Sequence, residues 1–304
     1  ADALTGGDGS DTMFGGEGRQ GDLSDRGDDY LTGDEGADTL YASAGNNWLF
    51  GNGGDDRLIA GAGDDYVDGG AGDDRIWLQG ADVAYGGAGN DVITTFSTAA
   101  VFIDGGDGDD RLTGDDGNDE IVGGAGADLL VGAAGGDTLI GGEGDDTYRF
   151  ELGDGVDTLL DAGGADTIEL VSHSPGALTR DRIRLVADES EIWLAYGDEG
   201  DRIRLGVDPA GTIETVARRT VNGAAETLES WSLASMRVTL EGVDASEALF
   251  AVMNFENAIS GGGGRDVLLG GNRDDVLDGG GGDDLMKGGE GADRYVIGAA
   301  NGVD

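Results

Sequence analysis

A nine-residue phrase that recurs along most of the chain constrains its fold more than any other feature. One copy reads GGAGDDRIW at residues 69–77, and the general form is G-G-x-G-x-D-x-U-x, where U is apolar. The period runs from about residue 6 to residue 150 and returns at 261–297. The sixth-position acids are Asp11, Asp29, Asp38, Asp56, Asp65, Asp74, Asp82, Asp91, Asp110, Asp119, Asp128, Asp137 and Asp146, followed by Asp266, Asp275, Asp284 and Asp293.

Each phrase combines a turn with a very short strand. Glycine tolerates positive φ angles, so the segment G-G-x-G-x-D is neither a helix nor a central strand. The three residues x-U-x are enough for a short strand with one side chain facing inward. One phrase makes half a coil, and two phrases complete it. Successive coils should stack at the strand spacing of about 4.8 Å, with the U residues in a thin apolar ladder.

The charge of the chain shows that such a stack needs a cation. The sequence has 18 Lys and Arg against 63 Asp and Glu, a formal net charge of −45. One inward side chain per nine residues buries too little apolar surface to offset the entropy of ordering those residues. A divalent cation with oxygen ligands would neutralise the acids. Ca²⁺ accepts 6–8 oxygens in flexible geometry, whereas Mg²⁺ demands an octahedron and keeps its waters.

Composition also excludes several classes of function. The acidity disfavours nucleic acid as a partner, because phosphates would be repelled. The chain has no Cys and a single His, His173, so thiolate metal sites and Ser-His-Asp triads have no basis. No run of 18 apolar residues is present to span a membrane. We identify no catalytic residues and expect no enzyme activity in this chain.

Two blocks of repeats flank a segment of different sequence. We expect a roll at 1–150, a β-rich flanking or capping segment at 151–260, and a second roll at 261–304. The middle segment has fewer glycines and period-2 stretches such as DRIRL at 181–185 and 201–205, which favour half-buried strands. Residues 244–258 are predicted to carry a short helix.

The phrase resembles the calcium-binding nonapeptide of the repeats-in-toxin (RTX) family. The resemblance implies an all-β fold, a calcium-loaded parallel β-roll, with about 8 to 13 ions between turns two repeats apart. In the family one turn offers the carbonyls of positions 2 and 4 and the acid of position 6, and the stacked turn offers the carbonyls of positions 1 and 3 and its own acid. Carried over to 51–59 and 69–77, the ligands are Asn52, Gly54, Asp56, Gly69, Ala71 and Asp74.

The resemblance also implies a biological role. The middle segment is similar to the region that closes repeat blocks in adenylate cyclase toxin and other haemolysin-type proteins. The chain would be a monomeric calcium-binding module of a secreted bacterial protein, exported by type I secretion machinery and folded by extracellular Ca²⁺. We expect it to be part of a longer, toxin-like protein with its secretion signal beyond residue 304. The alternative is a calcium-rigidified repeat stalk of a bacterial adhesin or surface-layer protein.

Departures from the phrase predict where ions are missing. The substitutions are Gln20, Asn47 and Val101 at the acid position and Arg273 in place of a glycine, and 78–85 is one residue short while 95–104 is one residue long. Counting alternate phrases, a first edge carries Asp38, Asp56, Asp74, Asp91, Asp110, Asp128 and Asp146. The second edge carries Asp11, Asp29, Asn47, Asp65, Asp82, Val101, Asp119 and Asp137. We therefore expect a complete file of about six ions along the first edge and a broken file along the second.

Overall fold

The fold was analysed in a computed structural model of the chain. It describes residues 3–7, 9–15, 26–161, 163–173, 178, 183–188, 191–196, 201–205, 213–222, 225–232, 237–241, 248–250 and 256–296. The chain divides into two compact units, Ala1–Val171 and Ser172–Asp304. Within the described residues the regular structure consists of strands alone. The all-β prediction is confirmed.

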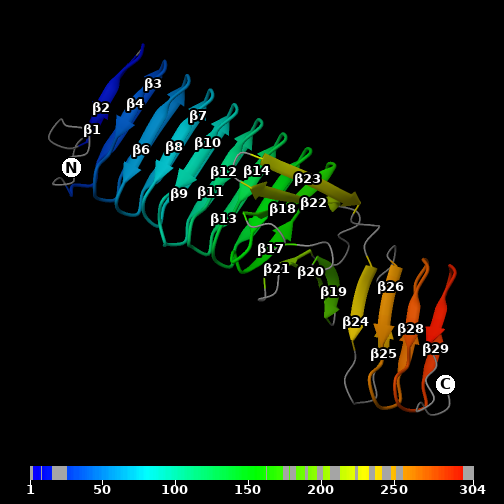
Figure 1. Ribbon diagram of the computed structural model, residues 1–304. Helices are drawn as coiled ribbons and strands as arrows, with labels where there is room; N and C mark the ends of the chain where they lie inside the picture. The colour runs from blue at the N-terminus through cyan, green and yellow to red at the C-terminus, as the bar shows by residue number, and fades with distance from the viewer. Residues whose placement is uncertain are drawn as a thin grey trace. The chain divides into compact units, whose positions relative to one another are not determined.

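The first unit is a parallel roll built from two sheets (Figure 1). Consecutive strands alternate between the sheets, and each strand pairs in parallel with the strand one coil away, as Trp48 does with Tyr66. The first sheet contains β1 (Ala3–Thr5), β3 (Tyr30–Glu35), β5 (Trp48–Gly53), β7 (Tyr66–Ala71), β9 (Val83–Ala88), β11 (Phe102–Asp107), β13 (Glu120–Ala125), β15 (Thr138–Glu143) and β17 (Val156–Leu160). The second sheet contains β2 (Thr12–Phe14), β4 (Thr39–Tyr41), β6 (Arg57–Gly61), β8 (Arg75–Leu78), β10 (Val92–Thr95), β12 (Arg111–Thr113), β14 (Leu129–Val131), β16 (Thr147–Glu151) and β18 (Asp166–Ser172).

A single row of apolar side chains per sheet forms the core. The U residues Leu49, Leu58, Val67 and Ile76 are at most 1% exposed, while their neighbours along each strand are intermediate or exposed. The alternation follows from the pleat of a strand, which turns successive side chains to opposite faces. The predicted thin apolar ladder is confirmed.

Glycine is required where the turns of successive coils touch. Gly72, at the fourth position, has a φ of 131°, a left-handed conformation that other residues rarely adopt. A Cβ atom added there would overlap the carbonyl oxygen of Gly54 in the preceding coil. The fourth-position glycine therefore sets how closely the turns stack.

The two length changes in the repeat do not disturb the strands. The coil from Asp74 to Asp91 spans 17 residues and the coil from Asp91 to Asp110 spans 19, in place of the usual 18. The missing and extra residues lie in the turns, so strand β10 keeps its register with both β8 and β12.

Asp11 lies on the opposite edge from the one predicted. Strand β2 pairs with β4 through Thr12 and Thr39, and the amide of Asp11 donates to Asp38 Oδ1, 27 residues away. This coil contains one complete extra phrase, so alternate counting assigned Asp11 wrongly to the second edge. Asp11 in fact continues the first edge below Asp38.

The roll continues beyond residue 150, where we expected the first block to end. Strand β17 pairs in parallel with β15, and β18 pairs in parallel with β16. The coils therefore extend to Ser172, with spacings of 20 residues in place of 18.

The second unit begins with antiparallel strands and ends with a second parallel stack. Strands β19 (Arg184–Asp188), β20 (Glu191–Ala195) and β21 (Arg202–Arg204) pair antiparallel, as do β22 (Ile213–Asn222) and β23 (Ala225–Ser232). The parallel stack contains β24 (Arg237–Glu241), β26 (Glu256–Ser260), β28 (Val276–Asp278) and β30 (Arg294–Val296), alternating with β25 (Ala248–Phe250), β27 (Val267–Leu269) and β29 (Leu285–Lys287). The period-2 strands are confirmed for the residues that these strands cover, and the capping role of the segment stays a prediction.

The helix predicted at 244–258 is wrong for the part that the structure describes. Residues 248–250 and 256–258 are in strands that pair in parallel with β27 and β28. Pairing with the neighbouring coil outweighs the local helical pattern. The remaining residues, 244–247 and 251–255, lie outside the described residues.

Candidate metal centres

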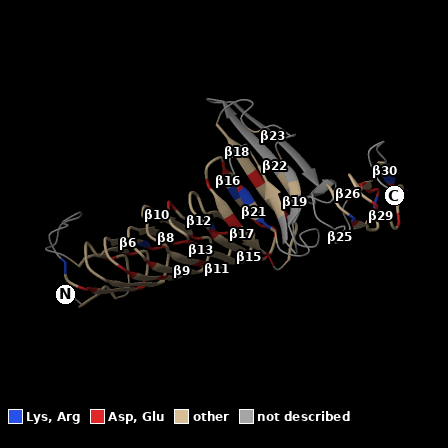
Figure 2. Ribbon diagram, turned by 90° about the horizontal axis from the view of Figure 1, so that it is seen from below, with Lys and Arg blue, Asp and Glu red and all other residues tan. Residues whose placement is uncertain are grey.

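The sixth-position acids form ladders along the edges of the roll (Figure 2). Each acid directly precedes a strand, and from Asp38 to Asp146 along the first edge its Oδ1 atom accepts a hydrogen bond from the amide of the equivalent residue one coil earlier. Asp38 N donates to Asp56 Oδ1 at 2.7 Å, and Asp56 N donates to Asp74 Oδ1 at 2.7 Å. These bonds fix the carboxylates inside the turns. The predicted acids that are buried are Asp29, Asp38, Asp56, Asp65, Asp74, Asp82, Asp91, Asp110, Asp119, Asp128, Asp137, Asp146, Asp266, Asp275 and Asp284, whereas Asp11 and Asp293 are partly exposed.

The second oxygen of every acid on the predicted first edge lacks a donor. The Oδ2 atoms of Asp38, Asp56, Asp74, Asp91, Asp110, Asp128 and Asp146 are buried and accept no hydrogen bond. A buried carboxylate oxygen without a partner is costly. The first edge thus presents an uninterrupted row of buried oxygens that a bound cation would stabilise.

Backbone oxygens converge on the same points. Asp56 Oδ2 and the carbonyl oxygen of Gly69 both face the place where a Cβ atom of Gly51 would stand. One coil further, Asp74 Oδ2 and the Gly86 carbonyl oxygen both face the place where a Cβ atom of Gly69 would stand. The Gly86 oxygen lies 2.6 Å from that place. First-position glycine keeps this space open. Carboxylate and carbonyl oxygens from two coils are a donor set that suits Ca²⁺.

The ligand set carried over from the family is only partly assembled in the structure. Asp56 and the Gly69 carbonyl converge, and Asp74 lies one coil further, held to Asp56 by the ladder hydrogen bond. The carbonyl oxygens of Asn52 and Gly54 face the places where Cβ atoms of Gly70 and Gly72 would stand in the next coil. The Ala71 carbonyl accepts a hydrogen bond from Gly54 N at 2.7 Å, which occupies one of its two lone pairs. The complete set stays a prediction.

On the second edge, protein groups replace the ion at several turns. The Asn47 side-chain amide donates to the Gly45 carbonyl and to Asp65 Oδ1, both at 2.9 Å. Asp82 Oδ2 accepts the amides of Gln79 and Gly80, both at 3.0 Å. At Asp82 these donors satisfy the oxygen that lacks a partner on the first edge, so this turn has less need of a cation, whereas Asp65 Oδ2, beside Asn47, is buried without a partner.

The remaining defect on this edge has a similar consequence. Val101 offers no carboxylate, although its amide still donates to Asp119 Oδ1 at 3.0 Å. Asp119 Oδ2 accepts the amide of Asp115 at 3.3 Å. The geometry agrees with a broken file of sites on the second edge, and ion occupancy on both edges stays a prediction.

The second unit contains turns whose acid is satisfied by protein donors and turns whose acid has an unpartnered oxygen. Asn257 donates its side-chain amide to Asp275 Oδ1 at 2.8 Å, and Gly271 N donates to Asp275 Oδ2 at 2.7 Å. On the other edge, Asp266 N donates to Asp284 Oδ1 at 2.9 Å, and Asp284 Oδ2 is buried without a partner. Asn257 was not anticipated from the sequence, because the phrase around it lacks the glycines.

The sequence analysis also missed three acids at the end of the first roll. Asp157 and Asp166 extend the two ladders, accepting the amides of Asp137 at 3.0 Å and Asp146 at 2.8 Å. Asp161 lies within reach of Asp146 and Asp166. The segment DAGGAD at 161–166 retains a glycine pair before an acid, and that signal would have identified the last turn.

Without a cation, the ladder carboxylates resist ionisation. Burial, opposed by the ladder hydrogen bonds and reinforced by neighbouring carboxylates, raises the pKa of Asp56 to about 6 and that of Asp74 and Asp110 to about 7. The ordinary value is 3.8. Protons therefore stabilise the ion-free roll in the range where these acids remain protonated.

We expect acid to replace calcium in part. Because the folded pKa values are raised, their contribution to stability is complete below about pH 4 and is lost as the pH rises through 6 to 7. In a chelator, circular dichroism should show more β structure at pH 5 than at pH 8. With Ca²⁺, the calcium concentration at the folding midpoint should fall as the pH falls from 8 to 5, because protons already stabilise the folded roll relative to the unfolded chain. Equal spectra at both pH values and a constant midpoint would contradict this.

The comparisons with known proteins agree with this geometry. A family model described as the RTX calcium-binding nonapeptide repeat matches residues 1–19, 24–49, 41–76, 78–95, 102–130, 113–148, 122–156 and 260–295. A search of curated proteins finds no match. In the part of the chain that the structure describes, no helix is long and apolar enough to cross a membrane. Because the family model covers more than half of the chain, the protein belongs to the RTX family of calcium-binding nonapeptide repeat proteins.

Proposed function

We propose that this chain is a calcium-operated folding module of a secreted bacterial protein. It is unfolded at the low calcium of the cytosol, passes the type I secretion machinery in that state, and folds on meeting extracellular Ca²⁺. It acts as a monomer and serves a toxin-like parent protein. The observation that supports the proposal best is the row of seven buried, unpartnered Oδ2 atoms on the first edge.

The charge and the small core of the calcium-free chain support calcium-dependent folding. A net charge of −45 repels itself, and each coil buries only a narrow apolar row. Folding without cations would also enclose a column of carboxylates spaced one coil apart. Ligand binding to the folded state alone adds stability by mass action, and here most of the sites arise only when coils stack. Calcium binding and folding of the chain would therefore be coupled.

The test is a calcium titration of the whole chain, followed by far-ultraviolet circular dichroism and hydrodynamic radius. In a chelator at pH 8 the chain should be expanded and poor in β structure. It should become compact at calcium concentrations of about 10⁻⁴ to 10⁻³ M, the range of extracellular calcium modules. A folded spectrum in chelator at low salt would refute the proposal.

Magnesium provides the matched control for this titration. We expect Mg²⁺ at the same concentration to fold the chain poorly, because it requires near-ideal octahedral geometry and dehydrates reluctantly. The turns offer a carbonyl-rich set from two coils, which a rigid octahedron does not match. Equal midpoints for the two ions would show that the acids act only as general counter-charge sites.

A further inference from the structure

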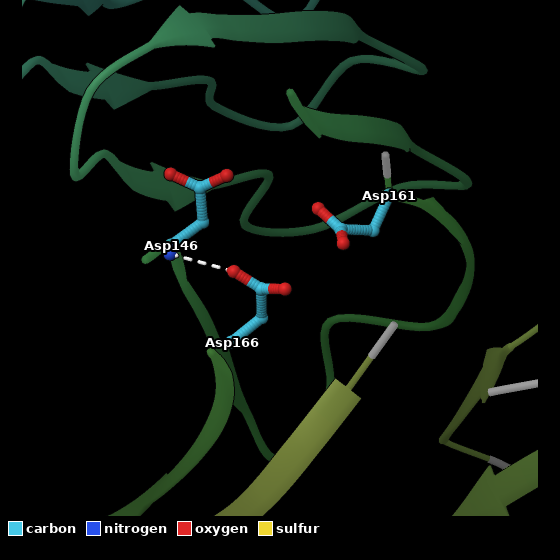
Figure 3. A group of neighbouring side chains, drawn as sticks. All are labelled: Asp146, Asp161 and Asp166. Atoms are coloured by element: carbon cyan, nitrogen blue, oxygen red, sulfur yellow. Dashed lines mark hydrogen bonds between the residues drawn. The ribbon is translucent and has the colours of Figure 1, made fainter. Parts of the chain in front are cut away.

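The last turn of the first roll differs from every complete turn before it. Asp161 follows β17 and occupies the first position of the segment 161–166, where Gly141 stands one coil earlier. Its carboxylate lies beside those of Asp146 and Asp166, and one oxygen of each of the three lies within 4.8 Å of the others (Figure 3). A third carboxylate thus stands beside two ladder acids.

The cluster also has a buried oxygen directed into it. Asp146 is 1% exposed, and its Oδ2 atom has no hydrogen-bond partner. This oxygen and the hydroxyl oxygen of Tyr148 converge on the place where a Cβ atom of Gly141 would stand, 2.8 Å from Asp161 Oδ1. Asp161 Oδ2 is buried and unpartnered too. Oxygens from one coil and from the first position of the next turn therefore converge on one point.

Tyr148 positions the additional acid. Its hydroxyl donates to Asp161 Oδ1 at 2.7 Å, so the carboxylate is held toward the ladder. Tyr148 is fully buried at a U position where the preceding coils of the same sheet carry the aliphatic residues Leu112 and Leu130. An aromatic side chain with a polar tip is needed at this position to reach the acid.

We propose that Asp146, Asp161 and Asp166 form a three-carboxylate calcium site that closes the first roll and binds the first ion. An interior acid lies between two successive gaps of the ladder and is shared by them, so each interior site has about one carboxylate charge. Asp161 adds a whole charge to the terminal gap. Calcium affinity rises with the number of charged ligands. The terminal site should bind Ca²⁺ more tightly than the repeat sites, by on the order of tenfold or more.

The experiment is a calorimetric calcium titration of the full chain, comparing wild type with Asp161→Asn. Asparagine keeps an oxygen acceptor for Tyr148, removes the charge and replaces the second carboxylate oxygen with an amide nitrogen. The variant should lose the tightest binding step, its first dissociation constant rising about tenfold or more, while the repeat sites still bind. The control is Asp109→Asn, which removes an exposed turn acid that accepts Ala127 N and should leave the first step unchanged.

Terbium luminescence reports the place of the first ion. Tb³⁺ bound beside Tyr148 should be sensitised by excitation of the phenol ring. The first equivalent should therefore emit in wild type and lose most of that emission in Tyr148→Phe and in Asp161→Asn. An unchanged first dissociation constant in Asp161→Asn, or first-equivalent emission insensitive to Tyr148→Phe, would overturn the terminal site. Such results with intact binding at the repeat sites would leave the proposed folding function standing.

Discussion

Replacing Asp91 with alanine should raise the calcium concentration needed for folding about tenfold or more, and far more than replacing Asp82 does. The two acids are closely matched. Both are 1% exposed, and each accepts one ladder hydrogen bond at 2.8 Å, from Asp74 N and Asp65 N respectively. They differ at Oδ2, which is unpartnered in Asp91 and accepts two amides of its own turn in Asp82.

Loss of calcium sites and loss of hydrogen bonds predict opposite rankings of the calcium midpoints of Asp91→Ala and Asp82→Ala. If only hydrogen bonds mattered, Asp82→Ala would be the worse variant, because it loses three bonds where Asp91→Ala loses one. If Oδ2 of Asp91 binds ions, Asp91→Ala disrupts the two sites on either side of it. The calcium midpoints from circular dichroism decide between them, and a higher midpoint for Asp82→Ala would refute the first-edge file.

The second large effect should come from a single methyl group in a turn. Gly54→Ala should destabilise the calcium-loaded roll by about 2 kcal/mol or more. Gly54 has a φ of 115°, and its Cβ atom would overlap the Gly36 carbonyl oxygen of the preceding coil. The strain and the collision add, because neither the backbone nor the stacked turn can move without separating the coils.

The adjacent glycine is the control for this variant. A Cβ atom on Gly53 would meet nothing closer than the Glu35 carboxylate at 3.4 Å, the flexible end of a side chain. Gly53→Ala should therefore change stability by no more than about 0.5 kcal/mol. Urea unfolding in saturating calcium measures both. Equal losses for the two variants would show that the close approach of the turns does not limit stability.

The regular part of this fold could be predicted from the sequence because its causes are local. The second- and fourth-position glycines, such as Gly70 and Gly72, adopt left-handed conformations that other residues rarely adopt, and a U residue such as Leu58 faces inward two places after its acid. These features repeat at a fixed spacing, so the stacked turns, the inward side chains and the ladder acids follow from the period. The strands of the first sheet are longer than the three residues predicted, because they continue through the glycine pair, as β7 does from Tyr66 to Ala71.

The irregular part depends on contacts that the period does not contain. Asp11 stacks on Asp38 because a whole extra phrase separates them, which counting alternate phrases cannot detect. Asp166 joins the ladder at a spacing of 20, outside the nine-residue alignment. The role of Asp82 also depends on how its side chain turns toward Gly80 N, since the residue type is the same as at the open turns.

A crystal structure of the chain grown in calcium, with ions located by their anomalous scattering, tests the central claim most directly. The proposal predicts a peak between each successive pair of acids from Asp38 to Asp146, next to the Oδ2 atoms that lack partners here. It predicts gaps on the second edge at Asn47 and Val101. Equally continuous files of ions on both edges, or a first edge without peaks, would contradict it.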